Sequence, residues 1–184
     1  MLHKTVCRAA MLALALCQAP GVALAGPQLL FEAASGRILF ADDVDVPWHP
    51  ASLTKLLTTY VVFEELKAGR VALDTKLALS DYARGQPATR IGLRLGIELN
   101  VEQALRGLIL RSANDFAVAL AEGVAGSEEA FVARMNETAR RLGMTRSQFR
   151  NPHGLPHDEQ VTSARDMGLL AHALLRDFPE RSEF

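Results

Sequence analysis

The sequence predicts an α/β protein of the α+β kind, in which a helical body lies beside a small antiparallel sheet. Two short β-type segments, residues 28–31 and 37–40, flank Ala34-Ser35-Gly36, which indicates a hairpin. From Ser52 onward, apolar residues recur at helical spacing through several successive segments. The 184 residues are 49% hydrophobic, which is enough for one domain with a sizeable core.

Residues 1–25 have the pattern of a secretory signal peptide. Lys4 and Arg8 give a basic start, and an apolar run follows over residues 9–16. Ala23-Leu24-Ala25 then places small residues where a signal peptidase cleaves, so cleavage is expected after residue 25. The apolar run is too short to span a bilayer. We therefore expect export, to the periplasm or the outer face of the cytoplasmic membrane.

Both cysteines, Cys7 and Cys17, lie in this segment. A lipoprotein signal ending at Cys17 is an alternative, but Leu16 precedes it where a small side chain is usual. Residues 26–184, which we expect to form part of one catalytic domain, contain no thiol. The sequence therefore predicts no disulfide framework, no cysteine-ligated zinc and no cysteine nucleophile there.

The charge pattern argues against nucleic acid as a partner. The formal net charge is −1, and no basic run or aromatic-basic interleaving occurs. The histidines of residues 26–184 are scattered without metal-ligand spacing, so no metal or cofactor is expected. They are His49, His153, His157 and His172.

The helical segments follow in order. A helix is expected to open at Ser52 and to end near residues 68–69, with an amphipathic apolar stripe. Residues 76–79 suggest a short strand, and residues 80–96, rich in Gly, Arg and turn residues, are expected to be irregular. A second amphipathic helix is predicted over residues 101–109.

Residues 116–124 are apolar on nearly every side, which is typical of a helix buried at the centre of a domain. The next helix begins near Ser127 and stops at Gly143. A loop with two prolines and a glycine occupies residues 149–160. Ser163 with Asp166 then resembles a capping box that opens the last helix.

Ser52 and Lys55 are the first candidates for chemistry. They are three residues apart at a helix start, so their side chains share one face. A serine hydroxyl becomes a useful nucleophile when an adjacent base takes its proton. An ordinary lysine, with a pKa of about 10.4, is protonated at neutral pH. Burial and a neighbouring cation would have to lower that pKa. The alternative is that Ser52 is only a helix N-cap.

The second candidate is Ser112-Ala113-Asn114, at a break between two helices. Polar residues in such a buried place need partners. In the simpler interpretation, Ser112 or Asn114 caps the following helix. In the functional one, Ser112 lies beside Lys55 as a proton relay, and Asn114 hydrogen-bonds a substrate backbone.

Together these motifs resemble those of penicillin-binding proteins, in which Ser-x-x-Lys and a Ser-x-Asn triplet occur in this order. Residues 50–55 are similar to the nucleophile segment of the low-molecular-weight D-alanyl-D-alanine carboxypeptidases, and residues 108–115 to their second motif. Residues 151–155 and 162–167 resemble two further segments of that family. The similarity extends over nearly the whole chain from Leu29 to Glu180.

The resemblance implies a β-lactamase/transpeptidase-like fold and an acyl-transfer mechanism. Ser52 would be the nucleophile, Lys55 its proton acceptor, Ser112 part of the proton path and Asn114 a substrate-binding residue. The implied substrate is a peptidoglycan stem peptide ending in D-Ala-D-Ala, and β-lactam antibiotics would inhibit by acylating the serine. No metal or cofactor is implied.

The family's third motif, Lys-Thr-Gly, does not occur in the sequence. Within residues 26–184 the lysines are Lys55, Lys67 and Lys76. In the family that motif lies on a later sheet strand and helps to bind the substrate carboxylate. We therefore expect these residues to be the N-terminal part of a longer enzyme, with an incomplete sheet and little or no activity by themselves. Membrane association through a missing C-terminal region is possible.

Three rival functions stay open at this stage. A class A-like β-lactamase would need a Glu-x-x-Leu-Asn loop, which residues 145–158 lack, and an aspartate where Ala113 stands. A D,D-endopeptidase would use the same machinery as a carboxypeptidase. A non-catalytic cell-wall binder or penicillin sensor would keep the fold without turnover.

Overall fold

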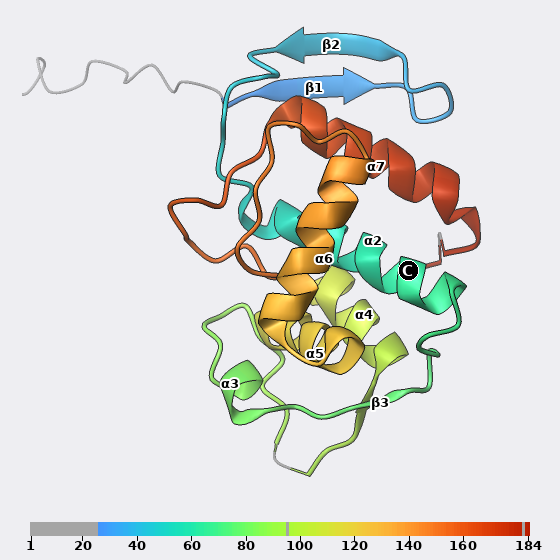
Figure 1. Cartoon of the computed structure of the whole chain (residues 1–184), viewed down its shortest axis with the longest axis vertical. Coiled ribbons are helices and arrows are strands. Elements are labelled where there is room, and N and C mark those ends of the chain that lie inside the picture. The colour runs from blue at the N-terminus through green and yellow to red at the C-terminus, as the bar shows by residue number, and fades with distance from the viewer. Residues whose placement is uncertain (1–25, 95, 182) are drawn as a thin grey trace, which may run out of the picture.

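The computed structural model describes residues 26–94, 96–181 and 183–184 (Figure 1). The expected signal peptide, residues 1–25, lies outside the described residues. The predicted helical body beside a small antiparallel sheet is confirmed. In chain order the elements are β1 (Gln28–Phe31), β2 (Ile38–Asp42), the 3-10 helix η1 (Ala51–Leu53), α2 (Thr54–Lys67), β3 (Lys76–Leu77), α3 (Asp81–Arg84), β4 (Leu99–Asn100), α4 (Val101–Arg111), α5 (Asn114–Ala125), α6 (Glu128–Arg141), α7 (Ala164–Asp177) and the 3-10 helix η2 (Pro179–Arg181).

The hairpin forms as predicted, with β1 antiparallel to β2 and the pair lying over α7 (Figure 1). The turn contains Gly36 with a φ of 72°, a left-handed conformation that glycine adopts without steric cost. On α7, a Cβ added to Gly168 would lie 2.3 Å from Cδ2 of Leu29. Glycine at that position therefore lets the strand approach the helix closely.

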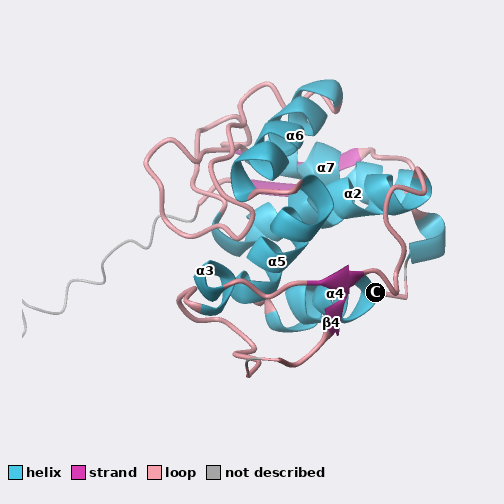
Figure 2. Cartoon of the chain, turned by 60° about the horizontal axis from the view of Figure 1, so that its bottom comes forward, coloured by secondary structure: helices cyan, strands magenta, loops and turns pink. Residues whose placement is uncertain are grey.

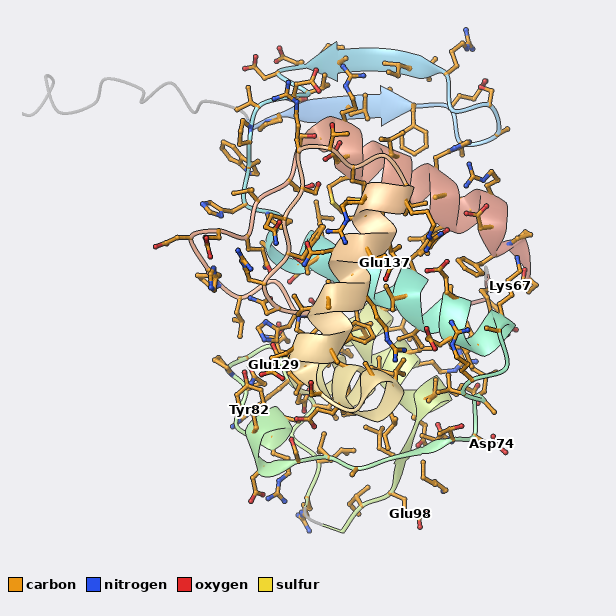
Figure 3. The ribbon with its side chains drawn as sticks, in the orientation of Figure 1. Lys67, Asp74, Tyr82, Glu98, Glu129 and Glu137 are labelled. Carbon is orange, nitrogen blue, oxygen red and sulfur yellow. The ribbon has the colours of Figure 1, made fainter. Side chains whose placement is uncertain are left out.

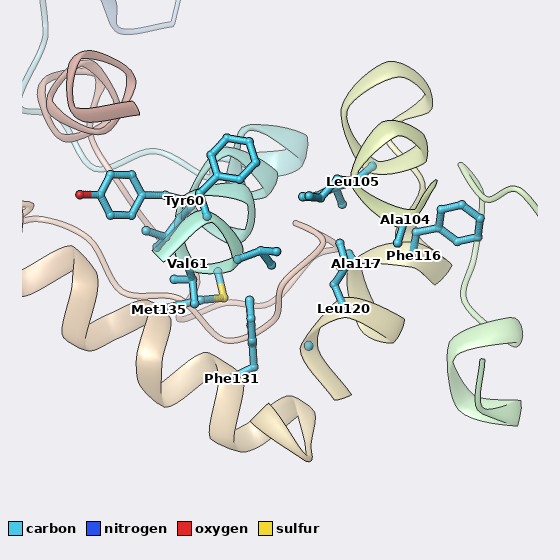
Figure 4. Close-up of a cluster of buried hydrophobic side chains, with 14 of the residues drawn as sticks. Tyr60, Val61, Ala104, Leu105, Phe116, Ala117, Leu120, Phe131 and Met135 are labelled. Atoms are coloured by element: carbon cyan, nitrogen blue, oxygen red, sulfur yellow. The ribbon is translucent and has the colours of Figure 1, made fainter. Parts of the chain in front are cut away.

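The core is built around α2, which contacts α4, α5, α6 and α7. Figure 4 shows Tyr60 and Val61 of α2 in the apolar cluster to which α6 contributes Phe131 and Met135, and α5 contributes Leu120. The expectation that this helix is merely amphipathic is wrong, because nearly all of its first ten residues are buried. Its polar residues find partners in the surrounding loops and helices, so burial extends beyond the apolar stripe.

The expected irregular segment, residues 80–96, contains the short helix α3. Its N-cap is Ser80, whose hydroxyl accepts a hydrogen bond from the backbone N–H of Ala83 at 3.0 Å. The strand expected over residues 76–79 ends at Leu77 and pairs with β4, which runs directly into α4 (Figure 2). The helix α3 and the strands β3 and β4 are too short to repeat a pattern.

Serine caps open the last two long helices, which begin where the sequence predicted. The hydroxyl of Ser127 accepts from Ala130 N at 3.1 Å, and that of Ser163 accepts from Asp166 N at 3.1 Å. The capping box expected at Ser163 is only half formed. The Asp166 carboxylate instead accepts from the Ser147 hydroxyl at 2.7 Å and so anchors the loop that follows α6.

Charged side chains of both signs surround the molecule. Lys67, Asp74, Glu98 and Glu137 are all exposed; the first three stand near the outline of the view, and Glu137 stands on α6 near its centre (Figure 3). Among the residues that the structure describes, no helix combines the length and the apolar character needed to cross a membrane.

Candidate active site

Ser52 lies in η1, the single 3-10 turn that leads into α2. Its side chain is exposed, and its Oγ lies 3.4 Å from Nζ of Lys55, one turn further on. The preceding residue, Ala51, has a φ of 47°. A residue with a Cβ rarely adopts that conformation, and such strain persists where surrounding structure enforces it. The surrounding structure therefore holds the turn that carries Ser52 in this conformation.

Lys55 is almost entirely buried, with 5% of its surface exposed. Its Nζ donates to Oδ1 of Asn114 at 2.8 Å and to the backbone oxygen of His153 at 2.6 Å. Burial lowers the pKa of Lys55 from 10.5 to about 8. At pH 7 about one lysine in ten would therefore carry a neutral amine, the form that can accept a proton.

The neighbouring cation that the sequence argument required is not the cause of this shift. His153, whose backbone oxygen binds the amine of Lys55, is itself buried. Burial, together with the charge of Lys55, lowers the pKa of His153 to about 4, so its imidazole is neutral at neutral pH. Removal from water alone accounts for the lowered pKa of Lys55.

The three contacts of the amine suit a general base. Asn114 Oδ1 and His153 O are acceptors, so each holds one N–H of Lys55. A neutral amine has two N–H groups and one lone pair. With both N–H groups held, the lone pair is left for the third direction, where the Ser52 hydroxyl lies. The site therefore accommodates the neutral amine in an orientation that can accept the serine proton.

Asn114 is buried at the first turn of α5. While its Oδ1 binds Lys55, its Nδ2 donates to the backbone oxygen of Pro87 at 3.0 Å. Its own N–H donates to Thr89 O at 2.8 Å. In this structure Asn114 thus positions the lysine and fastens residues 87–89 beside the site. Its expected contact with a substrate backbone stays a prediction.

Ser112 ends α4 in the left-handed conformation, with a φ of 53°. The expectation that Ser112 or Asn114 caps the following helix is wrong, because the N-cap of α5 is Ala113 and no side chain bonds there. The Ser112 hydroxyl is buried and has no hydrogen-bond partner among the described residues. The structure therefore brings Ser52, Lys55 and Asn114 into one hydrogen-bonded group, and leaves the Ser112 hydroxyl outside it.

Sequence reasoning predicted a loop over residues 149–160 and a family-like segment within it, but it did not identify how this loop holds Lys55. Their loop packs against the first turns of α2, where Thr58 Oγ1 donates to Pro152 O at 2.6 Å and Lys55 donates to His153 O. A Cβ added to Gly154 would lie 1.9 Å from the backbone oxygen of Ala51. The proline and glycine content predicted a loop, but a backbone oxygen has no residue-type signature that could have identified the contact.

Asp115 was also missed. Its carboxylate is fully buried and accepts from Gly92 N at 2.9 Å and from Ile91 N at 3.1 Å. It thereby holds the segment whose Pro87 and Thr89 oxygens bind Asn114. Its position directly after the Ser-x-Asn triplet was the only available signal.

Three comparisons with known proteins show which family this chain resembles. The chain matches the family model described as D-alanyl-D-alanine carboxypeptidase, peptidase S11, over residues 16–184. It is 40% identical over 158 residues to D-alanyl-D-alanine carboxypeptidase DacC of Escherichia coli K12, covering 83% of this chain and 40% of that protein.

Solved structures of a D-alanyl-D-alanine carboxypeptidase and of a penicillin-binding protein are similar to this chain. The D-alanyl-D-alanine carboxypeptidase DacD from Francisella tularensis superposes with a TM-score of 0.82 at 37% identity, over 88% of this chain and 39% of that one. Penicillin-binding protein 5 from Haemophilus influenzae gives 0.81 at 36% identity, over 88% and 48%. The expected transpeptidase-like fold is thereby confirmed. The chain spans about 40% of the length of the curated relatives it matches.

Proposed function

Because the chain belongs to the peptidase S11 family of D-alanyl-D-alanine carboxypeptidases, we propose that the full-length protein is a serine D-Ala-D-Ala carboxypeptidase that acts on peptidoglycan stem peptides. The observation that carries the proposal is the exposed Ser52 hydroxyl, 3.4 Å from the buried amine of Lys55. This pairing supplies the nucleophile and the base that acyl transfer requires.

The reaction takes two acyl transfers. The Ser52 Oγ attacks the carbonyl carbon between the two D-alanines while its proton passes to the neutral amine of Lys55. The tetrahedral intermediate collapses, the C–N bond breaks, and the departing amine of D-alanine takes a proton from the active site. Water then attacks the Ser52 ester in the same way, which releases the shortened peptide and restores the hydroxyl.

Ser112 and Asn114 have proposed roles in this cycle. We assign Ser112 to a proton relay, in which its hydroxyl gives its proton to the leaving amine and takes from Lys55 the proton that came from Ser52. This hydroxyl has no partner among the described residues. Asn114 keeps Lys55 in place through Oδ1, and its amide retains one N–H beyond the bond to Pro87. That N–H is the group we assign to the substrate backbone.

β-Lactams are the proposed inhibitors, because a strained lactam carbonyl would acylate Ser52 in place of the peptide. The similarity to a penicillin-binding protein supports this assignment. The family match favours a carboxypeptidase over the class A-like β-lactamase that the sequence left open. The proposal therefore predicts stable acylation rather than rapid antibiotic turnover.

Export is part of the proposal. A basic start, a short apolar run and Ala23-Leu24-Ala25 support a cleaved signal peptide over residues 1–25 and a periplasmic location. N-terminal sequencing of protein recovered from the periplasm tests this. A mature chain that begins at Gly26 is expected, and a retained Met1 would contradict it.

The deciding experiment labels the full-length protein with a fluorescent penicillin and locates the adduct by mass spectrometry. Label on the peptide that contains Ser52, with release of D-alanine from a D-Ala-D-Ala peptide, is expected. Ser52→Ala should abolish both, whereas the matched control Ser35→Ala, at an exposed serine of the hairpin turn, should change neither. Label retained after Ser52→Ala would overturn the nucleophile assignment. Cleavage of cross-linked peptides only would indicate the endopeptidase alternative.

A further inference from the structure

The position of Lys55 depends on a loop that has no regular secondary structure. The backbone oxygen of His153 holds its amine at 2.6 Å, and His153 lies in the middle of residues 149–160. A contact this close is maintained only if something else fixes the loop. Thr58 of α2 and Asn136 of α6 hold its first residues from outside, through Pro152 O and the Phe149 backbone. Within the loop, two further side chains fix the turn that carries His153.

Gln160 is the central one. Only 2% of its surface is exposed. Its Oε1 accepts from the backbone N–H groups of Arg150 at 2.9 Å and Asn151 at 3.0 Å. Its Nε2 donates to Oδ1 of Asn151 at 3.2 Å. One carboxamide therefore ties the last residue of the loop to its first residues.

Asn151 carries this constraint to the tip of the loop. Its Oδ1 also accepts from Gly154 N at 2.7 Å, and its Nδ2 donates to Leu155 O at 3.0 Å. These two bonds close a tight turn that has His153 at its apex, with the backbone oxygen turned toward Lys55. The chain of contacts runs from Gln160 through Asn151 to the amine.

Gln160 also joins the loop to the segment that carries the nucleophile. Its backbone oxygen lies 2.8 Å from Nδ1 of His49, and its Nε2 lies 3.5 Å from Oγ1 of Thr54, the residue before Lys55. At the other end of the turn, Gly154 rests against the backbone of Ala51. Gln160 thus contacts residues on both sides of Ser52, His49 before it and Thr54 after it.

We propose that Gln160 is a positioning residue that, through Asn151, holds the His153 backbone oxygen against Lys55 and so maintains the geometry of the general base. It touches neither substrate nor reacting atoms. The inference rests on the proposed function of Ser52 and Lys55, and extends it to a buried side chain with no chemistry of its own.

The test measures the rate of acylation of the full-length protein by a fluorescent penicillin from pH 6 to pH 10. Gln160→Met keeps the approximate volume and removes every side-chain bond. Gln160→Glu keeps the two bonds to Arg150 and Asn151 N–H groups and loses the donor to Asn151. Gln148→Met is the matched control, since Gln148 borders the same loop but pairs with Val161 through backbone atoms.

Gln160→Met is expected to slow acylation about 10- to 100-fold, because small displacements of a catalytic group have effects of that size. The pH at which the acylation rate reaches half of its maximum should also rise above the wild-type value. A loosened loop lets water reach the amine of Lys55, which raises its pKa. Gln160→Glu should fall between Gln160→Met and the wild type. The control should match the wild type in both rate and half-maximal pH.

Each other outcome overturns the inference. Thermal melting and active-site titration give the fraction of each variant that is folded. A folded Gln160→Met protein with wild-type rate and half-maximal pH would show that the carboxamide does not position the lysine. A rate that falls only in proportion to the folded fraction, with unchanged half-maximal pH, would show a purely structural role. If the wild type itself is not labelled at Ser52, the proposed function fails first.

Discussion

The amine of Lys55 lies 2.6 Å from the backbone oxygen of His153, 98 residues further along the chain. A second acceptor, Oδ1 of Asn114, lies 2.8 Å away and 59 residues along. These two contacts direct the amine toward Ser52, which is near it in sequence. Ser52 and Lys55, the proposed nucleophile and base, are thus local neighbours, but their geometry is set by a distant loop and by the first turn of α5.

The first prediction concerns the pH dependence of acylation. Burial brings the pKa of Lys55 down to about 8, so the neutral amine forms as pH rises through that value. The acylation rate by penicillin should therefore rise about tenfold between pH 7 and pH 9. Stopped-flow or gel-based labelling measures this.

Lys55→Arg supplies the control, because a guanidinium stays protonated throughout this range. Acylation should then fall by about 10²- to 10⁴-fold, the usual contribution of a general base. A wild-type rate that does not change between pH 7 and pH 9 would contradict the assignment of Lys55 as the base.

A second prediction follows from the other acceptor. Asn114→Asp changes the shape little but puts a negative charge 2.8 Å from the amine of Lys55. An adjacent opposite charge favours the charged amine, so the pKa of Lys55 should rise by about 1–3 units. The half-maximal pH of acylation should shift upward by the same amount.

The comparison variant is Asn136→Asp. Asn136 binds the backbone of Phe149 from α6, and its carboxamide makes no contact with Lys55. Asn136→Asp should lower stability without moving the half-maximal pH. An equal shift in both variants would mean that the effect is not local to the Lys55 amine.

The long helices were predictable because each repeats its apolar residues over several turns. Of the short elements, only β3 was expected, and as a longer strand: α3 has four residues and β3 and β4 have two each, so none repeats a pattern more than about once. The burial of α2 was also underestimated. Apolar spacing marks only the stripe, whereas Thr54, Thr58 and Glu65 are buried through partners that come from other parts of the chain.

The candidate site also contains residues that the sequence predicted and residues that it did not. Ser52, Lys55 and Asn114 could be selected because chemistry restricts their residue types and spacing. His153 acts through a backbone oxygen, which every residue possesses, and Gln160 acts through bonds to backbone N–H groups. Contributions of that kind depend on the path of the chain, so they become visible only when the loop is placed in space.

A third prediction concerns the contact between the loop and the nucleophile turn. Gly154 has a φ of 87°, and an added Cβ would meet the Ala51 backbone oxygen at 1.9 Å. Gly154→Ala should therefore cost about 1–3 kcal/mol from overpacking in addition to left-handed strain. It should also slow acylation of Ser52, because the displaced atoms directly precede the nucleophile. Denaturant unfolding and penicillin labelling measure the two effects.

Gly143→Ala is the matched control for this change. Gly143 has a φ of 80°, and nothing lies within 4 Å of its added Cβ. It should show the strain alone, about 1–2 kcal/mol, with an unchanged acylation rate. Equal stability losses and equal rates for the two variants would show that Gly154 does not support the turn.

The last prediction concerns stability in acid. Burial and the charge of Lys55 lower the pKa of His153 to about 4, although the Glu128 carboxylate lies 3.9 Å from its Nε2. Burial also raises the pKa of the Glu128 carboxyl group, so both groups of this contact are shifted toward their neutral forms. Between pH 6.5 and pH 4 an unfolded chain binds a proton at this histidine that the folded protein excludes.

This difference makes the folded state lose stability as pH falls. The contribution of His153 is complete above about pH 6.5 and should decline by about 3 kcal/mol by pH 4. His153→Asn retains an acceptor near the Nδ1 that binds Leu155 N, but it does not titrate. Its unfolding free energy should therefore fall less steeply over this range than that of the wild type.

His157→Asn is the appropriate comparison, since the exposed His157 makes the same kind of bond, from Glu159 N to Nδ1. It should keep the wild-type acid dependence. If urea unfolding between pH 7 and pH 4 gave parallel curves for wild type and His153→Asn, the imidazole would have to be protonated in the folded state. A protonated imidazole would contradict the neutral His153 inferred for the loop that holds Lys55. The acid limb of the stability curve thus tests the electrostatics of the site without any substrate.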